Sequence, residues 1–580
     1  MTKGGSYLIE VTDPQSVFTP EDFSQEDRMV ADMVADFTLN EIMPVTDDME
    51  AQKEGLMKSL MEKAGELGIL SADIPEEYGG GGLSKIVTTI ITENISMGGS
   101  FAVAQGAHTG IGTLPIVFFG TEEQKKRYLP DLASGKKLAA FGLTEPGAGS
   151  DALAARTKAV LSPDGKHYLL SGEKMFITNG GTAEVFVVFA KIDGEKFTAF
   201  IVERGTPGFS TGAEEHKMGI KGSSTCSLIF EDAPVPVENL LFEAGRGASV
   251  ALGVLDIGRF KLAAGAMGSA KAALGVAVRY AAGREQFKTP IIKFGLIREK
   301  LAQMAARTYA AESAVYRTAG LLEDALHGAS TGAETVTAME EYAVECSVNK
   351  NLASEVLDYV VDETVQIHGG YGYISEYAPE RYYRDARINR IFEGTNEINR
   401  LIIPGTLLRR AAKGQIPLLQ AAQALSREIF DLATLDAGEG VLAAEVRMVE
   451  MAKKMFLMVG GSAAQKYLDK IAYQQEVMGY LADMAIEIFA MDSAVARALK
   501  AAGRDGAPGV KASLAKAYVH SVFPNIELWG RKVLAHMAEG DELRTQLSVL
   551  KRLGRYEPCD LIALNQEIAD RVSEAGGYVV

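Results

Sequence analysis

The spacing of apolar and polar positions changes twice along the chain. The first 140 residues predict helices, whereas between residues 141 and 246 short β-branched and aromatic runs such as EVFVVFAKI and KFTAFIVE predict strands. From residue 247 onward, long segments rich in Ala and Leu return to helical spacing. The predicted order is therefore helical, β, and helical again.

Local signals mark the starts of helices and the turns between strands. Ser24 with Asp27, and Thr121 with Gln124, have the spacing of a capping box at a helix N-terminus. Tight reversals between strands are predicted at Ser162–Gly165 and at Asp193–Gly194, which suggests a compact antiparallel β domain.

A break at KGQIP, residues 413 to 417, divides the second helical region. We expect four parts: an N-terminal α-helical domain (1–140), a β-barrel domain (141–246), a C-terminal α-helical bundle (247–413) and an additional α-helical extension (414–580).

Composition and charge exclude several classes of protein. The 580 residues carry a formal net charge of −17, so a broad basic surface for nucleic acid is not expected. Three cysteines far apart form neither a disulfide framework nor a metal motif, which indicates a reducing compartment. The N-terminus lacks the pattern of a signal or transit peptide, and no apolar run approaches the ~20 residues of a spanning helix. A cytoplasmic protein is expected.

Two segments in the β region have the residue types of a nucleotide site. TEPGAGSD, residues 144 to 151, combines glycines that let backbone N–H groups approach a ligand with hydroxyls that form directed hydrogen bonds. MFITNGG, residues 175 to 181, offers an aromatic face and a hydroxyl next to a glycine turn. Taken alone, the first is more simply interpreted as a tight surface turn, and the second is also compatible with a strand end packed in the β core.

With three later segments, these two resemble the acyl-CoA dehydrogenase family. The resemblance runs from about residue 30 to residue 410, and the helical extension after residue 415 resembles the very-long-chain members. It implies an N-terminal helical domain, an antiparallel β-barrel, a C-terminal helical bundle and FAD as cofactor. It assigns to FAD Phe141, Leu143, Thr144, Gly149, Ser150, Phe176, Ile177 and Thr178. Many members have Trp where this chain has Phe176, so the ring is kept while the indole N–H is absent.

The third and fourth segments, by this resemblance, bind CoA and FAD. Asp256 and Arg259 are placed beside the CoA moiety with Ser150, although an i,i+3 ion pair on a helix explains the same two residues. Arg284 resembles the arginine that neutralises the FAD pyrophosphate. The resemblance adds to the FAD set Gln286, Phe287, Phe294 and Gly295.

The fifth segment runs from Gln366 to Arg400 and is the most specific. Gln366, Ile367, Gly369 and Gly370 match the residues that reach the adenine half of FAD on a neighbouring subunit, which implies a homo-oligomer. His368 has no second His or Cys at ligand spacing, so we interpret it as a loop histidine, and no metal site is expected.

Glu393 aligns with the catalytic base of the family. The α-hydrogen of a thioester is weakly acidic, so its removal needs an aligned carboxylate whose pKa burial has raised toward working pH. The resemblance implies hydride transfer from the β-carbon to flavin N5 and a trans-2-enoyl thioester product. It places Thr395, Asn396 and Glu397 toward FAD, and Phe392 and Gly394 beside the substrate. Gly258, where some branches carry the base, cannot accept a proton.

Substrate length and assembly are predicted less directly. The resemblance places GAHTGIG, residues 106 to 112, near the base of the acyl pocket, where small residues would leave room for a long acyl chain. A glycine-rich helix junction has the same sequence. In the relatives it resembles, the extension favours a dimer over a tetramer and can contact membranes. The apolar stretch Lys453–Val459 is equally compatible with packing between helices. Arg381, Arg384 and Arg387 are interpreted as a solvated helix face.

Three functions are compatible with these motifs. The resemblance favours a dehydrogenase for fatty acyl-CoA in the first step of β-oxidation, reoxidised by an electron-transfer flavoprotein. An acyl-CoA oxidase would form peroxide in air instead. A non-catalytic assembly partner would not need Glu393, Arg284 and both flavin segments intact.

Overall fold

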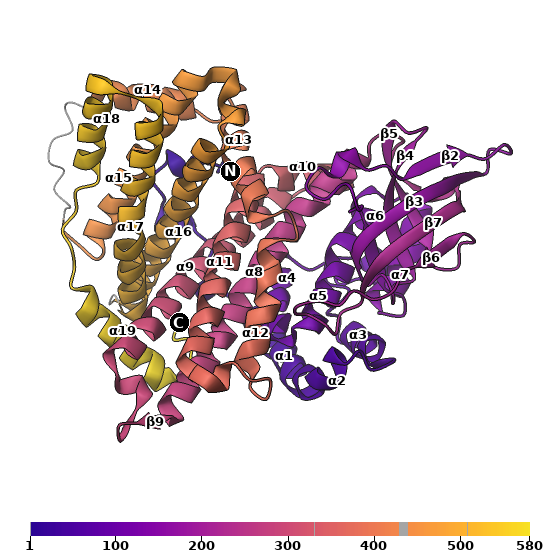
Figure 1. Cartoon of the computed structure of the whole chain (residues 1–580), viewed down its shortest axis with the longest axis horizontal. Helices are drawn as coiled ribbons and strands as arrows, with labels where there is room; N and C mark the ends of the chain where they lie inside the picture. The colour runs from indigo at the N-terminus through magenta and orange to yellow at the C-terminus, as the bar shows by residue number, and fades with distance from the viewer. Residues whose placement is uncertain (1, 330, 429–438, 507–508) are drawn as a thin grey trace. The chain divides into compact units, whose positions relative to one another are not determined.

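The computed structural model describes residues 2–329, 331–428, 439–506 and 509–580, and the chain forms two compact units (Figure 1). We call residues 24–268 and 322–340 the sheet unit, and residues 1–23, 269–321 and 341–580 the helical unit. Two long helices, α8 (Gly247–Gly283) and α9 (Gly295–Leu326), contribute residues to both units. The predicted order of helices, sheet and helices with a helical extension is confirmed.

The sheet unit begins with short helices whose N-termini are capped as predicted. The Ser24 hydroxyl accepts from the Asp27 N–H, and the Thr121 hydroxyl accepts from the Gln124 N–H, each in a complete capping box. The helices are α1 (Gln25–Phe37), α2 (Thr46–Glu50), α3 (Leu56–Glu66), α4 (Lys85–Ile95), α5 (Ser100–Ala107), α6 (Leu114–Phe119), α7 (Glu122–Ala133) and α10 (Gly332–Glu340).

The sheet of this unit has eight strands in the order β6-β7-β3-β2-β4-β5-β8, with β1 paired to β4. Most pairs are antiparallel, but β1 and β2 both run parallel to β4, so the predicted wholly antiparallel pairing is wrong there. Non-adjacent strands can pair in parallel because a longer connection reverses the chain between them. The strands are β1 (Ala139–Gly142), β2 (Lys158–Leu161), β3 (His167–Thr178), β4 (Val185–Ile192), β5 (Lys196–Glu203), β6 (Phe209–Thr211), β7 (Thr225–Pro236) and β8 (Leu240–Leu241).

Both predicted reversals join neighbouring strands. Ser162–Gly165 lies between β2 and β3, and the Gly165 N–H donates to the Ser162 carbonyl. Asp193 and Gly194 lie between β4 and β5 with φ of 54° and 78°. Positive φ at two successive residues suits the twist of a tight hairpin, which is why Asp-Gly is favoured there.

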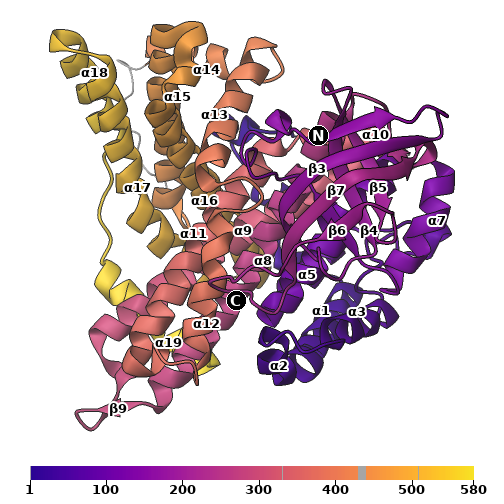
Figure 2. The same cartoon turned by 45° about the vertical axis from the view of Figure 1, so that its right-hand side comes forward.

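The helical unit is a bundle with a small β hairpin. Helices α15, α16 and α17 run side by side in both ribbon views (Figures 1 and 2). Besides its parts of α8 and α9, the unit comprises β9 (Glu285–Gln286), β10 (Thr289–Pro290), α11 (Ala343–His368), α12 (Ala378–Ala386), α13 (Asn396–Ala412), α14 (Leu418–Glu428), α15 (Ala443–Tyr467), α16 (Gln475–Asp505), α17 (Gly509–Met537), α18 (Gly540–Leu553) and α19 (Leu561–Ala575).

The segment from residue 2 to residue 23 belongs to the helical unit and packs against its C-terminal helices. The Tyr7 ring lies 4.8 Å from that of Phe489, and its hydroxyl donates to the Ala485 carbonyl. Arg497, which is 1% exposed, pairs with Glu21 at 2.8 Å and with Glu312 at 2.6 Å. The extension and the N-terminal segment therefore share one core and one buried set of charges.

The apolar stretch Lys453–Val459 packs between helices. Met455, Phe456, Leu457 and Val459 are buried in α15, so the helix-packing interpretation of this stretch is confirmed. Throughout the described part of the chain, no helix is both long and apolar enough to cross a membrane.

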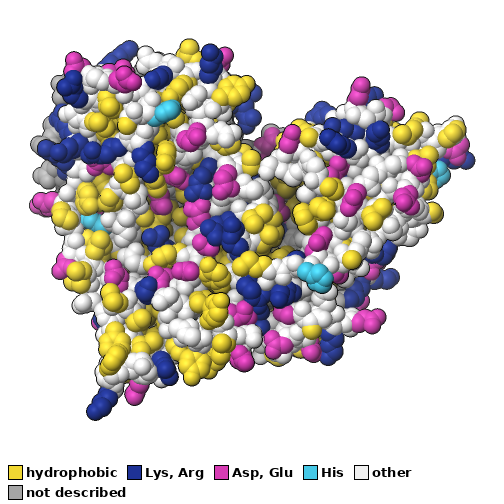
Figure 3. All heavy atoms as spheres, viewed as in Figure 1, with side chains coloured by type: hydrophobic (Ala, Val, Ile, Leu, Met, Phe, Trp, Pro, Cys, Tyr) yellow, Lys and Arg dark blue, Asp and Glu magenta, His cyan; other side chains and the backbone are white. Residues whose placement is uncertain are grey.

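The surface carries both signs of charge. On the face that Figure 3 shows, Lys and Arg side chains are interspersed with Asp and Glu side chains. No broad face of one sign is visible in that view.

Candidate functional site

The first predicted flavin segment begins on β1 and continues into a tight turn. Phe141 is buried on β1, and its ring lies 5.1 Å from that of Phe189 on β4. Beyond the strand, Glu145 and Ala148 exchange backbone hydrogen bonds of 3.0 and 3.1 Å, which closes the turn. Leu143 is buried, Thr144 is half-buried, and Gly149 and Ser150 are exposed at the end of the turn.

Buried polar contacts of Glu145 fix the shape of this turn. Its carboxylate accepts from the N–H groups of Arg156 and Thr157 and from the ammonium of Lys174 at 2.7 Å. Burial raises the pKa of Glu145, but these donors outweigh it and hold the pKa below its usual range. Lys174, which is fully buried, also donates to the Leu143 carbonyl at 3.3 Å. Sequence reasoning missed Lys174, whose only local signal is its inward position on β3.

The second predicted flavin segment lies beside the first. The Met175 N–H donates to the Thr144 carbonyl at 2.8 Å, so β3 and the turn after β1 are neighbours. A β-bulge shifts the register between Lys174 and Ile177, and Phe176 within it has φ of 59°. Its ring is 60% exposed, whereas Ile177 is buried and Thr178 is half-buried. Bulges of this kind re-aim a side chain beside an active site.

This arrangement fits a flat polar cofactor such as a flavin. Phe176 combines a positive φ with an exposed ring, and both are unfavourable in the absence of a ligand. Backbone strain of this kind is common where a ligand is bound. A Cβ added at Gly147 or Gly149 would meet nothing within 4 Å, so backbone N–H groups there are approachable. The Ser150 hydroxyl is exposed next to them.

Asp256 and Arg259 form the ion pair that their spacing suggests. They lie one turn apart on α8, both nearly buried, with 2.5 Å between the guanidinium and the carboxylate. The pairing accounts for their burial and does not conflict with a role toward CoA. Gly258 lies between them in α8 and offers no carboxylate.

The GAHTGIG segment forms a π-helical turn, His108–Gly112, between α5 and α6. Its histidine accepts from the Ala139 N–H at Nδ1, so Nε2 carries the proton toward the Leu132 carbonyl. Burial lowers the pKa of His108 to about 4, so the ring is neutral. A Cβ at Gly112 would lie 2.8 Å from that of Ala139, so close packing against β1 excludes a larger residue at this position. The segment is thus a helix junction, and its role in an acyl pocket stays a prediction.

Arg284 and the Gln366–Gly370 segment are neighbours in the helical unit. The Arg284 guanidinium lies 5.5 Å from the Tyr371 ring, and the Tyr280 ring stacks on His368 at 4.0 Å. Arg284 and Gln366 are exposed, whereas Ile367 is buried.

Around Arg284, the remaining predicted FAD residues are mostly accessible. Phe287, 91% exposed, lies with φ of 52° in the β9–β10 turn. Its ring is 6.3 Å from that of Phe294. Gly369, with φ of 59°, has no atom within 4 Å of an added Cβ, and the same is true of Gly295 and Gly370.

His368 is the last residue of α11, so its interpretation as a loop histidine is wrong. It is buried, its Nδ1 lies 2.7 Å from the Thr364 carbonyl, and burial lowers its pKa. No group of three or more His, Cys, Asp and Glu side chains in the described ranges is arranged to hold a metal ion.

Glu393 lies in a short segment that leads into α13. Its φ is 57° and that of Gly394 is 79°, so two successive residues are left-handed, and the side chain is half-buried. Thr395 caps α13, accepting from the Ile398 N–H at 3.2 Å. Asn396 is buried, whereas Phe392 is half-buried and Glu397 is exposed.

Two donors hold the Gly394 carbonyl. The ammonium of Lys350, on α11, donates to it at 2.8 Å, and the Asn399 amide does so at the same distance. Sequence reasoning missed Lys350, because a lysine in an apolar helix gives no sign of which carbonyl it will reach.

The arginines before Glu393 are less solvated than predicted. Arg381, Arg384 and Arg387 are half-buried, and Arg384 forms a two-pronged ion pair with Glu380 at 2.7 and 3.0 Å. The aliphatic part of such an arginine packs along the helix, and its guanidinium pairs with a glutamate one turn earlier, so less of the side chain contacts water.

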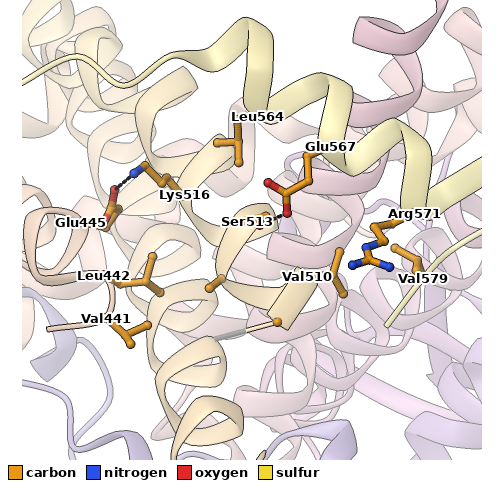
Figure 4. A pocket seen from close by; sticks show the side chains of 12 residues that line it. Val441, Leu442, Glu445, Val510, Ser513, Lys516, Leu564, Glu567, Arg571 and Val579 are labelled. Atoms are coloured by element: carbon orange, nitrogen blue, oxygen red, sulfur yellow. Dashed lines mark hydrogen bonds and ion pairs between the residues drawn. The ribbon is translucent and has the colours of Figure 1, made fainter. Parts of the chain in front are cut away.

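A cavity of about 730 Å³ lies among α15, α17 and α19 (Figure 4). Leu442 and Val510 line it together with the hydrogen-bonded pair Ser513 and Glu567. None of the predicted site residues lines this cavity, so the chemistry of the cofactor segments does not extend to it.

Helical and sheet domains, with the predicted flavin segments at the β1 turn and the β3 bulge and with the Glu393 segment before α13, are the features of a cofactor-dependent enzyme. Models of acyl-CoA dehydrogenase domains match most of the chain: the N-terminal domain at residues 24–136, the middle domain at 140–233, and two models, both described as the C-terminal domain, at 245–408 and 451–552. The chain belongs to the acyl-CoA dehydrogenase family and is an oxidoreductase.

Similar proteins include one that matches the whole chain and one that matches three quarters of it. A probable acyl-CoA dehydrogenase of Bacillus subtilis is 51% identical over 100% of this chain and 98% of its own length. The human mitochondrial very long-chain specific acyl-CoA dehydrogenase is 38% identical over 75% of this chain and 68% of its own. A crystal structure of an acyl-CoA dehydrogenase complexed with FAD from Bacillus anthracis has a TM-score of 0.99 and 51% identity, covering 100% of both chains. The family resemblance expected from the motifs is confirmed.

Proposed function

We propose that this chain binds FAD and converts a fatty acyl-CoA to the trans-2-enoyl-CoA, with Glu393 as the general base. The observation that carries the proposal is the fixed backbone at Glu393. Two left-handed residues, a carbonyl held by two donors and a capped helix fix the backbone that carries this carboxylate, in a chain of the acyl-CoA dehydrogenase family.

The residues around Phe176 would hold the flavin ring. Arg284 would neutralise an FAD pyrophosphate, and the Gln366–Gly370 segment would reach the adenine half of the FAD of a second copy. The exposed Phe176 ring would lie against the isoalloxazine, with the turn at Gly149 and Ser150 contributing hydrogen bonds. Arg284 is exposed and would pair with the pyrophosphate. FAD, when bound, supplies a hydride acceptor for the substrate β-carbon.

The protein's own contribution is alignment and proton transfer. The Glu393 carboxylate would take the α-proton of the thioester, and its backbone N–H would donate to the carbonyl oxygen where negative charge develops. A base in a fixed backbone needs little reorganisation when the proton moves. Asp256 and Arg259, a nearly neutral pair, would contact CoA without adding net charge.

We further propose a long or very long acyl chain, an electron-transfer flavoprotein as electron acceptor, a cytoplasmic location and a homodimer. The C-terminal extension, which also occurs as a matched domain model at residues 451–552, supports the chain length. The exposure of Gln366, Gly369 and Gly370 supports a role toward FAD of a second copy.

The test is a pair of glutamine variants of the FAD-loaded enzyme. Glu393→Gln should keep its flavin and lose turnover with a long-chain acyl-CoA by more than about 1,000-fold, because the proton acceptor is gone. Glu376→Gln, an exposed glutamate of the same unit, should retain wild-type turnover. Substantial turnover by Glu393→Gln would move the base to another residue. Arg284→Ala should lose FAD on gel filtration, and full flavin retention would remove its proposed role.

A further inference from the structure

Lys350 is a fully buried lysine on α11, and its ammonium contacts the segment that carries Glu393. It donates to the Gly394 carbonyl at 2.8 Å and to Asn396 Oδ1 at 2.6 Å. We propose that Lys350 is a positioning residue that sets the orientation of the Glu393 carboxylate for proton abstraction. This inference rests on the proposed role of Glu393 as the base.

The backbone at Glu393 needs such a restraint. A φ of 57° is unfavourable for a residue with a Cβ, and Gly394 follows at 79°. Without external contacts, a glutamate would return to negative φ, which would swing its side chain away. The Gly394 carbonyl is the first acceptor after this strained pair, so a donor fixed in space there holds the conformation.

Lys350 connects that carbonyl to the start of α13. The Asn396 amide, whose oxygen Lys350 binds, donates to Ser354 Oγ at 3.1 Å and to Glu355 Oε1 at 2.9 Å. Arg400 of α13 in turn grips both oxygens of Glu355, at 2.7 and 3.0 Å. The segment after Glu393 is therefore tied to α11 through a series of buried or half-buried contacts that begins at the Lys350 ammonium.

An ammonium suits this position better than a neutral donor. It offers three N–H groups at the end of a long stem, so one side chain can bind the carbonyl and the amide oxygen together. Hydrogen bonds from a charged donor are stronger than neutral ones when water is excluded. Burying a lysine is unfavourable unless its hydrogen bonds are made, so its placement 0% exposed against this segment indicates a specific contact.

The experiment compares two buried lysines in the FAD-loaded protein. Lys350→Met keeps the stem and removes the donors. We expect the rate of flavin bleaching by a long-chain acyl-CoA, measured anaerobically by stopped flow, to fall at least about 30-fold through misplacement of the base. The Kd of the acyl-CoA should stay within about 3-fold of wild type, and the flavin content should not change. The substitution leaves the contacts that bind the substrate and the flavin in the ground state in place.

Lys453→Met is the matched control. Lys453 is also buried in the helical unit, and it binds Asp492 at 3.1 Å and the Glu10 carbonyl at 2.9 Å. Asp492 keeps its pair with Arg317 at 2.8 Å when Lys453 is lost. The bleaching rate of this variant should stay within about 3-fold of wild type, because its contacts do not reach the Glu393 segment.

Several results would overturn the inference. One is a bleaching rate of Lys350→Met within about 3-fold of wild type; another is an equal loss of rate in Lys453→Met, which would indicate a general effect of removing a buried lysine. If Lys350→Met does not fold, Asn399→Leu removes the second donor to the Gly394 carbonyl and should slow bleaching about 10-fold, and an unchanged rate contradicts the inference. If Glu393→Gln retains turnover, the proposed base itself is refuted. If Glu393→Gln is inactive but Lys350→Met bleaches its flavin at the wild-type rate, only the positioning role is refuted.

Discussion

Phe176→Gly separates folding from cofactor binding. Phe176 has φ of 59° and is 60% exposed, so its ring contributes little to the core. Glycine would relieve about 1–2 kcal/mol of left-handed strain. Two effects lower the stability of the variant. The greater freedom of glycine in the unfolded chain costs about 0.5–1 kcal/mol, and loss of the buried part of the ring costs about 1 kcal/mol. The free energy of unfolding of the flavin-free protein should therefore change by less than about 1 kcal/mol.

FAD binding should respond quite differently. Stacking of an aromatic side chain on a heterocyclic base is worth about 1–3 kcal/mol, which predicts a Kd for FAD about 5- to 150-fold higher in Phe176→Gly. The assay is fluorescence titration of the flavin-free protein with FAD, alongside its thermal unfolding.

Leu468→Gly is the matched control for strain. Leu468 is 69% exposed with φ of 49°, and it is the residue after the end of α15, outside the predicted flavin segments. Its substitution should leave the Kd for FAD unchanged. An unchanged Kd in Phe176→Gly would refute the stacking role, and a loss of several kcal/mol in folding would show that the ring is a core residue.

Two further predictions concern stability. Burial raises the pKa of Glu345 to about 7, above its unfolded value, so this group stabilises the fold at low pH and the benefit is lost between about pH 4.5 and 7. Glu345→Gln should thus raise the unfolding free energy by up to about 3 kcal/mol at pH 8 and by about 1 kcal/mol at pH 5, and an equal gain at both pH values in thermal unfolding would contradict the sign. Arg497→Met leaves Glu21 and Glu312 without their shared partner and should lower stability by about 3–5 kcal/mol. Arg544→Met, which breaks an exposed pair with Asp541, should change it by less than about 0.5 kcal/mol; similar shifts in the two would refute the argument from burial.

The parts of the fold that sequence predicts are those with local causes. The capping box at Ser24 and the reversal at Asp193–Gly194 depend on neighbouring residues, and both have the predicted form. The parallel pairing of β1 with β4 depends on residues 46 positions apart, as in Ala139 with Val185. No local pattern specifies such a partner. The sequence therefore predicts antiparallel pairing throughout, which is wrong for β1 and β4.

The same distinction applies to the candidate site. Phe176 and Glu393 were found from motifs, but their positive φ values were not, since neither residue type favours that region. The contacts of Lys350 with Gly394 span 44 positions and those of Lys174 with Glu145 span 29. A buried lysine is unusual enough to be noticed only once its burial is known, so these two supporting residues emerged from the structure alone.

Anaerobic titration of the purified FAD-loaded protein with acyl-CoAs of increasing chain length tests the central claim most directly. Loss of the flavin absorbance in the wild type, strongest with long-chain thioesters and absent in Glu393→Gln, is the result that the proposed reaction predicts. A bound flavin that no acyl-CoA reduces would contradict dehydrogenation and favour a non-catalytic role for this chain.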